Sequence, residues 1–277
     1  MSERDYLLSK DGLKLYYRAW LVDTPKAVLC IVHGLGEHSG RYKKVAAFFN
    51  DHDISVLAMD NRGHGKSEGK KGHGPDYQLL LSDVEELMKK ARSEHTEAPM
   101  ILMGHSMGGN FVGNFVMQEN VNELAGFILS SAWIKLAFEP PQWKVNLARK
   151  VATVLPFLTQ GNELNTAHLS RDEEEVRKYE EDPLVHDKIS VRLFTDCLTN
   201  GIKLLESDKK LKIPGLVIHG TADHITDPKA SEEFAEKHDN VEYVPIEGSY
   251  HETLNDLDRE KVLDVLLHWI EAQSSDA

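Results

Sequence analysis

The sequence predicts an α/β fold: a mostly parallel eight-stranded sheet with helices on both faces and a helical cap inserted after the sixth strand. Three observations predict it. Short apolar runs alternate with amphipathic helical segments, which is typical of parallel βαβ construction. This alternation breaks down over residues 131–200, which are helical in character and rich in aromatic residues and prolines. An apolar run also ends in a glycine-flanked serine turn at 104–108, and an apolar helical pattern follows at once.

The opening of the chain differs from the rest. Residues 5–9 and 13–20 are predicted as strands joined at Asp11-Gly12, a hairpin signal that indicates antiparallel edge strands. The remaining apolar runs predict strands at 27–32, 54–59, 100–103, 125–130, 214–219 and 241–245. Amphipathic patterns predict helices near 40–51 and 77–95, from the serine turn to about 118, near 228–237, and from about 256 to 272.

A chain of 277 residues can bury one large core, so we expect a single domain with an insertion. The α/β core is assigned to residues 1–132 and 201–277, and the cap to residues 133–200. An insertion after the sixth strand lies over the carboxyl edge of the sheet. Its apolar side chains either pack inside the cap or contact an apolar substrate or a membrane surface; they are Trp133, Phe138, Trp143, Val154, Leu155, Phe157 and Leu158.

Composition limits the class of partner and the compartment. A net charge of −13, spread along the chain, argues against a nucleic-acid surface. The two cysteines, Cys30 and Cys197, suggest neither a disulfide framework nor a cysteine-based metal site, and favour a reducing compartment. No apolar leader and no apolar run of membrane-spanning length occurs. We therefore expect a cytoplasmic protein.

The turn Gly104-His105-Ser106-Met107-Gly108 makes Ser106 the nucleophile candidate. Glycines remove the Cβ atoms that would collide where a strand turns directly into a helix, and such a turn projects the serine hydroxyl out of the sheet. It also leaves the Met107 N–H at a helix N-terminus, where it can stabilise an oxyanion. The same G-x-S-x-G pattern recurs at residues 65–69 within a charged stretch, so Ser67 is read as a loop serine and stays an alternative nucleophile.

A serine needs a base, and the base needs a group that orients it. Asp223 directly follows the strand predicted at 214–219, and His251 follows the strand predicted at 241–245. The chain order Ser106, Asp223, His251 is that of the α/β-hydrolase fold, in which all three residues meet at one edge of the sheet. Alternatives stay open: Asp227 for the acid, and His224 or His219 for the base.

The segment VHGLGE at 32–37 follows a strand and can supply a second oxyanion donor, the Leu35 N–H. Its alternative reading is a dinucleotide-binding loop, since Gly34 and Gly36 follow a strand. The third glycine of that fingerprint is absent, because the chain continues Glu37-His38-Ser39.

Six segments together resemble the monoacylglycerol lipases and their lysophospholipase-like bacterial relatives: HGLGEHSGRY (33–42), DNRGHGKSEG (60–69), GHSMGG (104–109), YEEDPL (179–184), HGTADHITDP (219–228) and GSYHE (248–252). The resemblance implies hydrolysis of a small-molecule ester, a single-acyl glycerol, to fatty acid and glycerol without a cofactor. It also implies that Leu35 and Met107 form the oxyanion hole, and that Glu37, Arg41 and Tyr179 hold the glycerol.

The chain departs from the family pattern at two places. Thr226 stands where some members carry a cysteine, so sensitivity to thiol reagents is not expected. The segment ETLND after His251 lacks a second histidine found in others.

Other activities of the fold use the same triad: hydrolysis of short or xenobiotic esters, peptide hydrolysis, or cofactor-free haloperoxidation. A non-catalytic ligand-binding protein would be expected to lose a triad member. Membrane contact through residues 136–158 is a further hypothesis.

Overall fold

The computed structural model describes residues 2–118, 121 and 123–275. Eight strands form one sheet in the order β1-β2-β4-β3-β5-β6-β9-β10. All neighbours are parallel except β1 with β2 and β2 with β4. The strands are β1 (Ser2–Leu8), β2 (Lys14–Trp20), β3 (Ala27–Val32), β4 (Ile54–Met59), β5 (Met100–His105), β6 (Leu124–Ser130), β9 (Gly215–Gly220) and β10 (Val241–Ile246). The predicted sheet is confirmed, with the first strand at 2–8 rather than 5–9.

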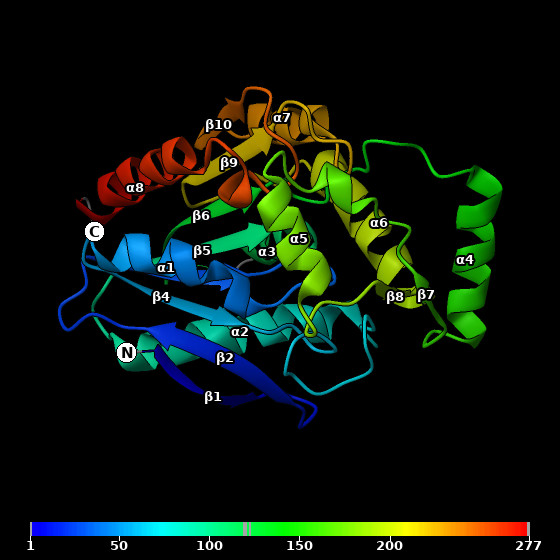
Figure 1. The fold of residues 1–277 in the computed structure, drawn as a ribbon, viewed down its shortest axis with the longest axis horizontal. Helices are drawn as coiled ribbons and strands as arrows, with labels where there is room; N and C mark the ends of the chain where they lie inside the picture. The colour runs from blue at the N-terminus through cyan, green and yellow to red at the C-terminus, as the bar shows by residue number, and fades with distance from the viewer. Residues whose placement is uncertain (1, 119–120, 122, 276–277) are drawn as a thin grey trace.

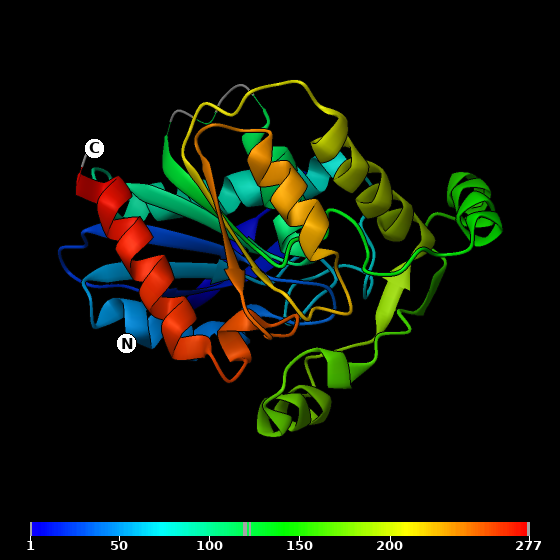
Figure 2. The ribbon, with the colours of Figure 1, turned by 90° about the horizontal axis from the view of Figure 1, so that it is seen from above.

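Helices cover both faces of the sheet (Figures 1 and 2). On one face α1 (Lys43–Asn50), which follows a short 3₁₀ turn, packs with α8 (Arg259–Ser275). On the other face lie α2 (Tyr77–Glu94), α3 (Met107–Val116) and α7 (Pro228–Glu236). Two of these helices begin at aspartates, Asp76 and Asp227, whose side chains accept from backbone N–H groups of the first turn. The predicted helices are confirmed to within a few residues at their ends.

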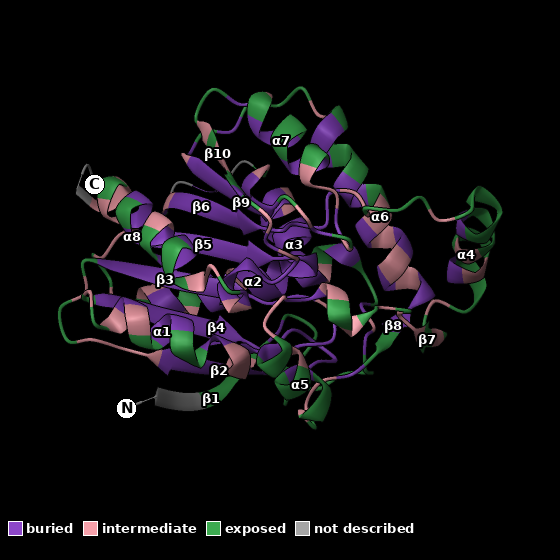
Figure 3. Ribbon diagram, turned by 45° about the horizontal axis from the view of Figure 1, so that its top comes forward, coloured by how far each residue is buried: buried purple, intermediate pink, exposed green. Residues whose placement is uncertain are grey.

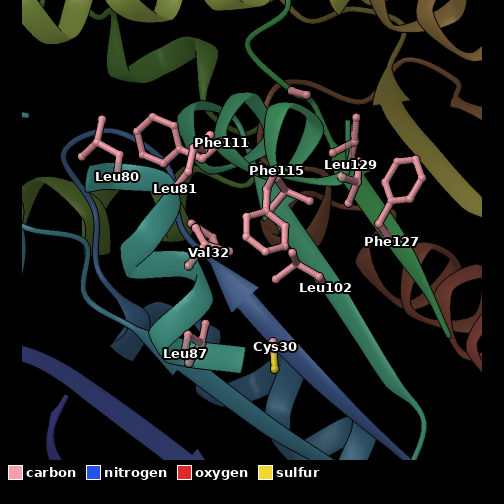
Figure 4. Close-up of a cluster of buried hydrophobic side chains, with 14 of the residues drawn as sticks. Cys30, Val32, Leu80, Leu81, Leu87, Leu102, Phe111, Phe115, Phe127 and Leu129 are labelled. Atoms are coloured by element: carbon pink, nitrogen blue, oxygen red, sulfur yellow. The ribbon is translucent and has the colours of Figure 1, made fainter. Parts of the chain in front are cut away.

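The central strands are buried along their whole length. Every residue of β3, β4 and β5 is buried, because helices exclude water from both faces of the sheet. Figure 4 shows part of one of the two core clusters: Val32 of β3 and Leu102 of β5 lie beneath α3 with its Phe111 and Phe115, and Cys30 of β3 belongs to the same cluster. This packing fixes the end of β5 and the start of α3 relative to each other, and that junction carries the serine turn.

The cap follows β6, as predicted, and lies beyond the carboxyl ends of the parallel strands (Figure 1). It contains α4 (Gln142–Val154), β7 (Thr159–Gly161), a 3₁₀ turn (Thr166–His168), α5 (Glu173–Glu181) and β8 (Lys188–Ser190). The short antiparallel pair β7-β8 was not predicted. Helix α6 (Val191–Glu206) packs against α3 and runs across the boundary that the sequence assigned at residue 200. The domain limits themselves stay a prediction.

Most apolar side chains of the first part of the cap are exposed. Trp133 is 5% exposed and is buried in the fold, whereas Trp143 is 65% exposed and Val154 75%. Phe138, Leu155, Phe157 and Leu158 are also exposed, and internal packing therefore does not account for them. In Figure 3 most of α4 is green, in contrast to the purple strands. Prolines bound this helix on both sides, at 141 and 156.

Candidate active site

Ser106 stands alone between β5 and α3 in a strained conformation. Its φ is 52° and its ψ −116°, a region that costs energy for a residue with a Cβ atom. Its backbone N–H donates to the Ser130 carbonyl at 3.0 Å, which anchors the turn to β6. In the described part of the chain its Oγ makes no hydrogen bond, and the residue lines a cavity of about 580 Å³. The hydroxyl is thus held ready for an external partner.

The two flanking glycines are required by close backbone contacts. A Cβ on Gly104 would lie 2.4 Å from the Gly108 carbonyl oxygen, and a Cβ on Gly108 would lie 2.1 Å from the Val32 carbonyl oxygen. Neither space can hold a methyl group, since backbone atoms cannot move aside cheaply. The prediction that glycines allow strand and helix to meet at this turn is confirmed.

Asp223 and His251 form a buried pair in the same cavity as Ser106. The two loops that follow β9 and β10 bring them together, and His251 Nδ1 lies 2.7 Å from Asp223 Oδ2. Because a carboxylate only accepts, Nδ1 carries the proton and Nε2 is left as the acceptor for a serine hydroxyl. The predicted residues thus converge on one cavity.

The charges of this pair reinforce each other. Burial alone would raise the pKa of Asp223, but the facing imidazoles of His251 and His219 lower it far below its usual range, so the carboxylate stays ionised. Burial alone would lower the pKa of His251, but the Asp223 carboxylate raises it above its ordinary value. Asp223 therefore stabilises the imidazolium that forms when His251 takes a proton.

The residues considered as alternatives for the acid and the base make different contacts from Asp223 and His251. Asp227 caps α7 by accepting from the Lys229 N–H at 3.0 Å. His219 is fully buried behind Asp223, and it is not among the residues that line the cavity. His224 lines the cavity, where its ring packs on His168 at 4.8 Å between centroids. Of the described histidines, His251 combines the carboxylate partner with access to the cavity.

Two backbone amides flank the serine. Leu35 lies in the loop after β3 and lines the cavity, and a Cβ on the preceding Gly34 would lie 3.1 Å from Ser106 Cβ, so this loop abuts the nucleophile. Met107 is the first residue of α3, and its N–H has no intrahelical partner. Within the described residues, neither N–H donates a hydrogen bond to another group.

The Glu37 side chain holds the loop after β3 in place through hydrogen bonds. Its Oε1 accepts from the Gly34 N–H at 2.7 Å and from the Tyr42 hydroxyl at 3.0 Å, and its Oε2 accepts from Arg41 at 3.1 Å. Burial alone would raise the pKa of Glu37, but the charge of Arg41 lowers it to about 2. Glu37 is therefore a buried anion that pins the loop carrying Leu35.

Arg41 links this loop to the loop of the triad histidine. Its guanidinium donates to both carboxylate oxygens of Glu252, at 2.5 and 2.6 Å, as well as to Glu37. The guanidinium also lies 4.8 Å over the centre of the Tyr179 ring. The cavity lining includes Glu37, Tyr179 and Glu252 but not Arg41, which lies behind them. The sequence missed Glu252: it directly follows His251, but a pairing over 211 positions leaves no local signal.

The cavity itself lies between the sheet edge and the cap and has a volume of about 580 Å³. Much of its wall is apolar and comes from both core and cap, through Trp133, Leu136, Leu164, Leu169, Ile189 and Phe194. Its charged lining consists of four acidic residues, Glu37, Glu163, Asp223 and Glu252, and in the described chain no lysine or arginine lines it. The cavity can therefore hold an apolar chain, and its polar wall contains no lysine or arginine among the described residues.

Comparisons with known proteins agree with this geometry. A family model described as serine aminopeptidase, S33 matches residues 23–258. The chain is 31% identical to the monoacylglycerol lipase of Mycolicibacterium smegmatis over 94% of its own length and 93% of the lipase. It is 32% identical, over 98% of its own length, to an abhydrolase domain-containing protein of Dictyostelium discoideum, but spans 29% of that protein.

Comparison with a solved structure also shows similarity to a monoacylglycerol lipase. The monoacylglycerol lipase of Paleococcus ferrophilus superposes with a TM-score of 0.84 at 32% identity, covering 94% of this chain and 99% of that one. The chain therefore belongs to the serine aminopeptidase S33 family of α/β-hydrolases, the family that includes the monoacylglycerol lipases.

Proposed function

We propose that this protein is a serine carboxylester hydrolase that cleaves monoacylglycerols, or similar single-chain acyl esters, to a fatty acid and an alcohol. The observation that carries the proposal is the Asp223–His251 pair, 2.7 Å apart, on the wall of the cavity that Ser106 also lines. The family membership and the lipase relatives support the same chemistry.

The first half of the reaction forms an acyl-enzyme. His251 Nε2 takes the proton of Ser106 Oγ, and the oxygen attacks the acyl carbonyl carbon. The negative charge moves to the carbonyl oxygen, which accepts hydrogen bonds from the Leu35 and Met107 N–H groups. The bond to the alcohol oxygen then breaks, and His251 gives that oxygen its proton.

The second half releases the fatty acid. A water molecule loses a proton to His251 and attacks the acyl carbon, and the bond to Ser106 Oγ breaks as His251 returns the proton to the serine. Asp223 stays ionised throughout, since its role is to orient His251 and to stabilise its cationic form. The chain supplies every group that these steps need.

The apolar wall suits a long acyl chain. Each methylene that leaves water contributes about 0.8 kcal/mol, so a long chain gains more from an apolar cavity than a short one. The volume, about 580 Å³, falls in the range of roughly 300–1,000 Å³ found for small-molecule sites. We expect kcat/KM to rise with chain length from acetate onward, measured on p-nitrophenyl esters; a sharp maximum at acetate would contradict the long-chain proposal.

The polar wall suits an uncharged alcohol. Glu37, Glu252 and Tyr179 offer hydrogen-bonding groups for glycerol hydroxyls, while Arg41 acts from behind by holding both carboxylates. A phosphate headgroup would meet carboxylates and no lysine or arginine among the described lining residues. Like charges at close range are repulsive, so monoacylglycerols are favoured over lysophospholipids.

The test uses octanoyl esters: 1-octanoylglycerol, dioctanoylglycerol, octanoyl lysophosphatidylglycerol, whose headgroup carries a net negative charge, and p-nitrophenyl octanoate, with aminoacyl anilides for peptidase activity. The Ser106→Ala variant is the blank. We expect kcat/KM for the lysophospholipid to be at least about tenfold below that for 1-octanoylglycerol, since each 1.4 kcal/mol of repulsion costs tenfold. Preferred cleavage of anilides would replace the proposal with peptidase activity.

We also propose that the cap touches lipid surfaces transiently. Support comes from exposed apolar side chains on α4 and the segment after it, at Trp143, Leu147, Val154, Leu155, Phe157 and Leu158. None of the helices in the described residues has the length and apolar character to cross a bilayer. Sedimentation with neutral liposomes tests the contact: binding should weaken in Trp143→Ala plus Leu147→Ala, and absence of wild-type binding at low and high salt would remove the proposal.

A cytoplasmic location remains part of the proposal. It is supported by the two cysteines, Cys30 and Cys197, which are free and fully buried in separate elements, β3 and α6. Fractionation of the native host with an antibody against the protein tests it, and recovery from an exported fraction would contradict it.

A further inference from the structure

Asp223 accepts more hydrogen bonds than a catalytic triad needs. Its Oδ2 lies 2.7 Å from His251 Nδ1, 2.9 Å from His219 Nε2 and 2.9 Å from Thr226 Oγ1. Its Oδ1 accepts from the N–H groups of Ile225 at 2.7 Å and Thr226 at 3.2 Å. The carboxylate therefore shares its negative charge between two imidazoles, of which one faces the cavity.

His219 is built to be a hydrogen-bond donor to this carboxylate. It is the fifth residue of β9 and has no exposed surface. Because the Asp223 carboxylate only accepts, His219 Nε2 carries a proton, and its Nδ1 lies 2.8 Å from the hydroxyl of Ser231 on α7. Its ring does not reach the cavity lining, so it cannot touch substrate.

We propose that His219 is a positioning residue that sets the pH at which His251 becomes a free base. A carboxylate that accepts an additional hydrogen bond holds a neighbouring imidazolium less tightly. Donation from His219 therefore weakens the hold of Asp223 on protonated His251 and extends activity toward lower pH. This inference rests on the proposed function, in which His251 is the general base.

Other groups also surround His251. The His105 ring at the end of β5 packs on it at 4.9 Å between centroids, and burial lowers the pKa of His105 to about 4, so it stays neutral. Glu252 and Glu37 also act on His251, and both are paired with Arg41. Thr226 Oγ1 lies 3.3 Å from both His251 Nδ1 and His219 Nε2, and it donates to Asp223 Oδ2 at 2.9 Å. A change at His219 should therefore reach His251 through Asp223 and the threonine hydroxyl bound to it.

The experiment compares His219→Phe, which keeps a ring but no donor, with His219→Gln, whose amide N–H can replace the Nε2 donor. The acid limb of kcat/KM is measured on p-nitrophenyl butyrate. We expect its midpoint to rise by about half a pH unit or more in His219→Phe, because the undivided carboxylate stabilises protonated His251 better. His219→Gln should keep the wild-type midpoint.

His238→Phe is the matched control, since His238 is a buried histidine whose ring nitrogens make no hydrogen bond in the described chain. Its midpoint should not move. A lower kcat in His219→Phe with an unchanged midpoint would mean a merely structural role and would overturn the inference. Equal shifts in His219→Phe and His219→Gln would overturn it too, because donation would then not be the cause.

Two further measurements keep the inference separate from the proposed function. If His219→Phe does not fold, His219→Leu provides another side chain without a donor. NMR titration of the His251 ring measures its pKa directly, and an unchanged pKa in the variant without a donor overturns the inference. Retention of full activity in Ser106→Ala would instead overturn the proposed function while leaving the NMR result valid.

Discussion

Two segments of this chain carry the same G-x-S-x-G pattern and differ in what the fold does with the serine. Ser106 lies between a buried strand and a buried helix, and its hydroxyl has no partner in the described residues. Ser67 lies in a loop, where its hydroxyl donates to the Asp60 carbonyl at 2.5 Å and accepts from the Tyr16 N–H at 2.7 Å. The difference teaches that the same local pattern can hold one hydroxyl in structural hydrogen bonds and leave another without a partner in the described residues.

The surroundings of Ser67 explain why its hydroxyl is used. Lys14 N–H donates to Glu68 Oε2 at 2.9 Å, and Lys66 N–H donates to Asp60 Oδ2 at 2.8 Å. Together with the two bonds of Ser67 itself, these contacts tie the loop to β2 and to the end of β4. The loop thus needs its serine hydroxyl for structure, whereas the turn at Ser106 is held by backbone contacts and by the His105 ring, which lies 3.1 Å from the Ser130 carbonyl oxygen.

Alanine at each serine tests this comparison most strongly. Ser106→Ala should lower kcat by at least about 10⁴-fold, since removing the nucleophile of a triad removes most of its rate enhancement. Ser67→Ala should keep kcat within about twofold, because the loop does not contact the reacting atoms. Steady-state hydrolysis of p-nitrophenyl butyrate measures both. Loss of activity in Ser67→Ala with full activity in Ser106→Ala would reverse the assignment.

The two aspartates of the loop after β9 offer a second, smaller test. Asp223→Asn should lower kcat by about 10³- to 10⁴-fold, because an amide favours the wrong tautomer of His251. Asp227→Asn should keep kcat, since asparagine also caps helices and the Asp227 side chain accepts from the Lys229 N–H in the first turn of α7. Similar kcat losses in the two variants would contradict the pairing of Asp223 with His251.

The dependence of kcat/KM on pH should show a smaller effect than these substitutions. Activity needs neutral His251, so kcat/KM should fall about tenfold per pH unit below the pKa of that ring. Burial opposes the charged form, but the Asp223 carboxylate raises the pKa above its ordinary value of about 6.5, so the midpoint should lie above pH 6.5. Ser67→Ala should show the same midpoint. A midpoint near pH 4, the region of buried His105, would identify the wrong base.

The free energy of unfolding should show the smallest effects. Here Ser67→Ala should matter more than Ser106→Ala, which is the reverse of their expected effects on kcat. Ser67→Ala should lower the free energy of unfolding by about 1–2 kcal/mol, because it removes the partner of the Tyr16 N–H and a bond to Asp60. Ser106→Ala should change it by less than about 0.5 kcal/mol, since no hydrogen bond of its hydroxyl is lost. Urea unfolding measures both. Greater destabilisation by Ser106→Ala would break the comparison.

Much of the framework was predictable because its signals are local. Apolar runs predicted the sheet, and the contrast between an apolar and a charged context favoured Ser106 over Ser67. The positions of Asp223 and His251 after two late strands predicted that they would meet, because carboxyl ends of parallel strands share one edge. The structure brings these residues to one cavity.

Other features could not be predicted, because they depend on contacts between distant segments. Arg41 was expected at the glycerol, but it lies behind the cavity wall between Glu37 and Glu252. His219 was considered as a base, but it lies outside the cavity lining, against the same Asp223 oxygen, Oδ2, that faces His251. The apolar residues of the cap follow no clear periodicity. The sequence therefore could not predict which of their side chains are packed and which are exposed.

The sequence by itself determined the order of strands and helices, the site of the nucleophile turn and the residues able to form a triad. These depend on neighbouring side chains, glycine sterics and hydrophobic period, which the chain carries locally. Only the tertiary structure decided which hydroxyl stays without a partner, which imidazole reaches the cavity and which charges are neutralised. Those outcomes arise from burial and from pairing across the sheet edge, where residues far apart in the chain compete for the same hydrogen bonds.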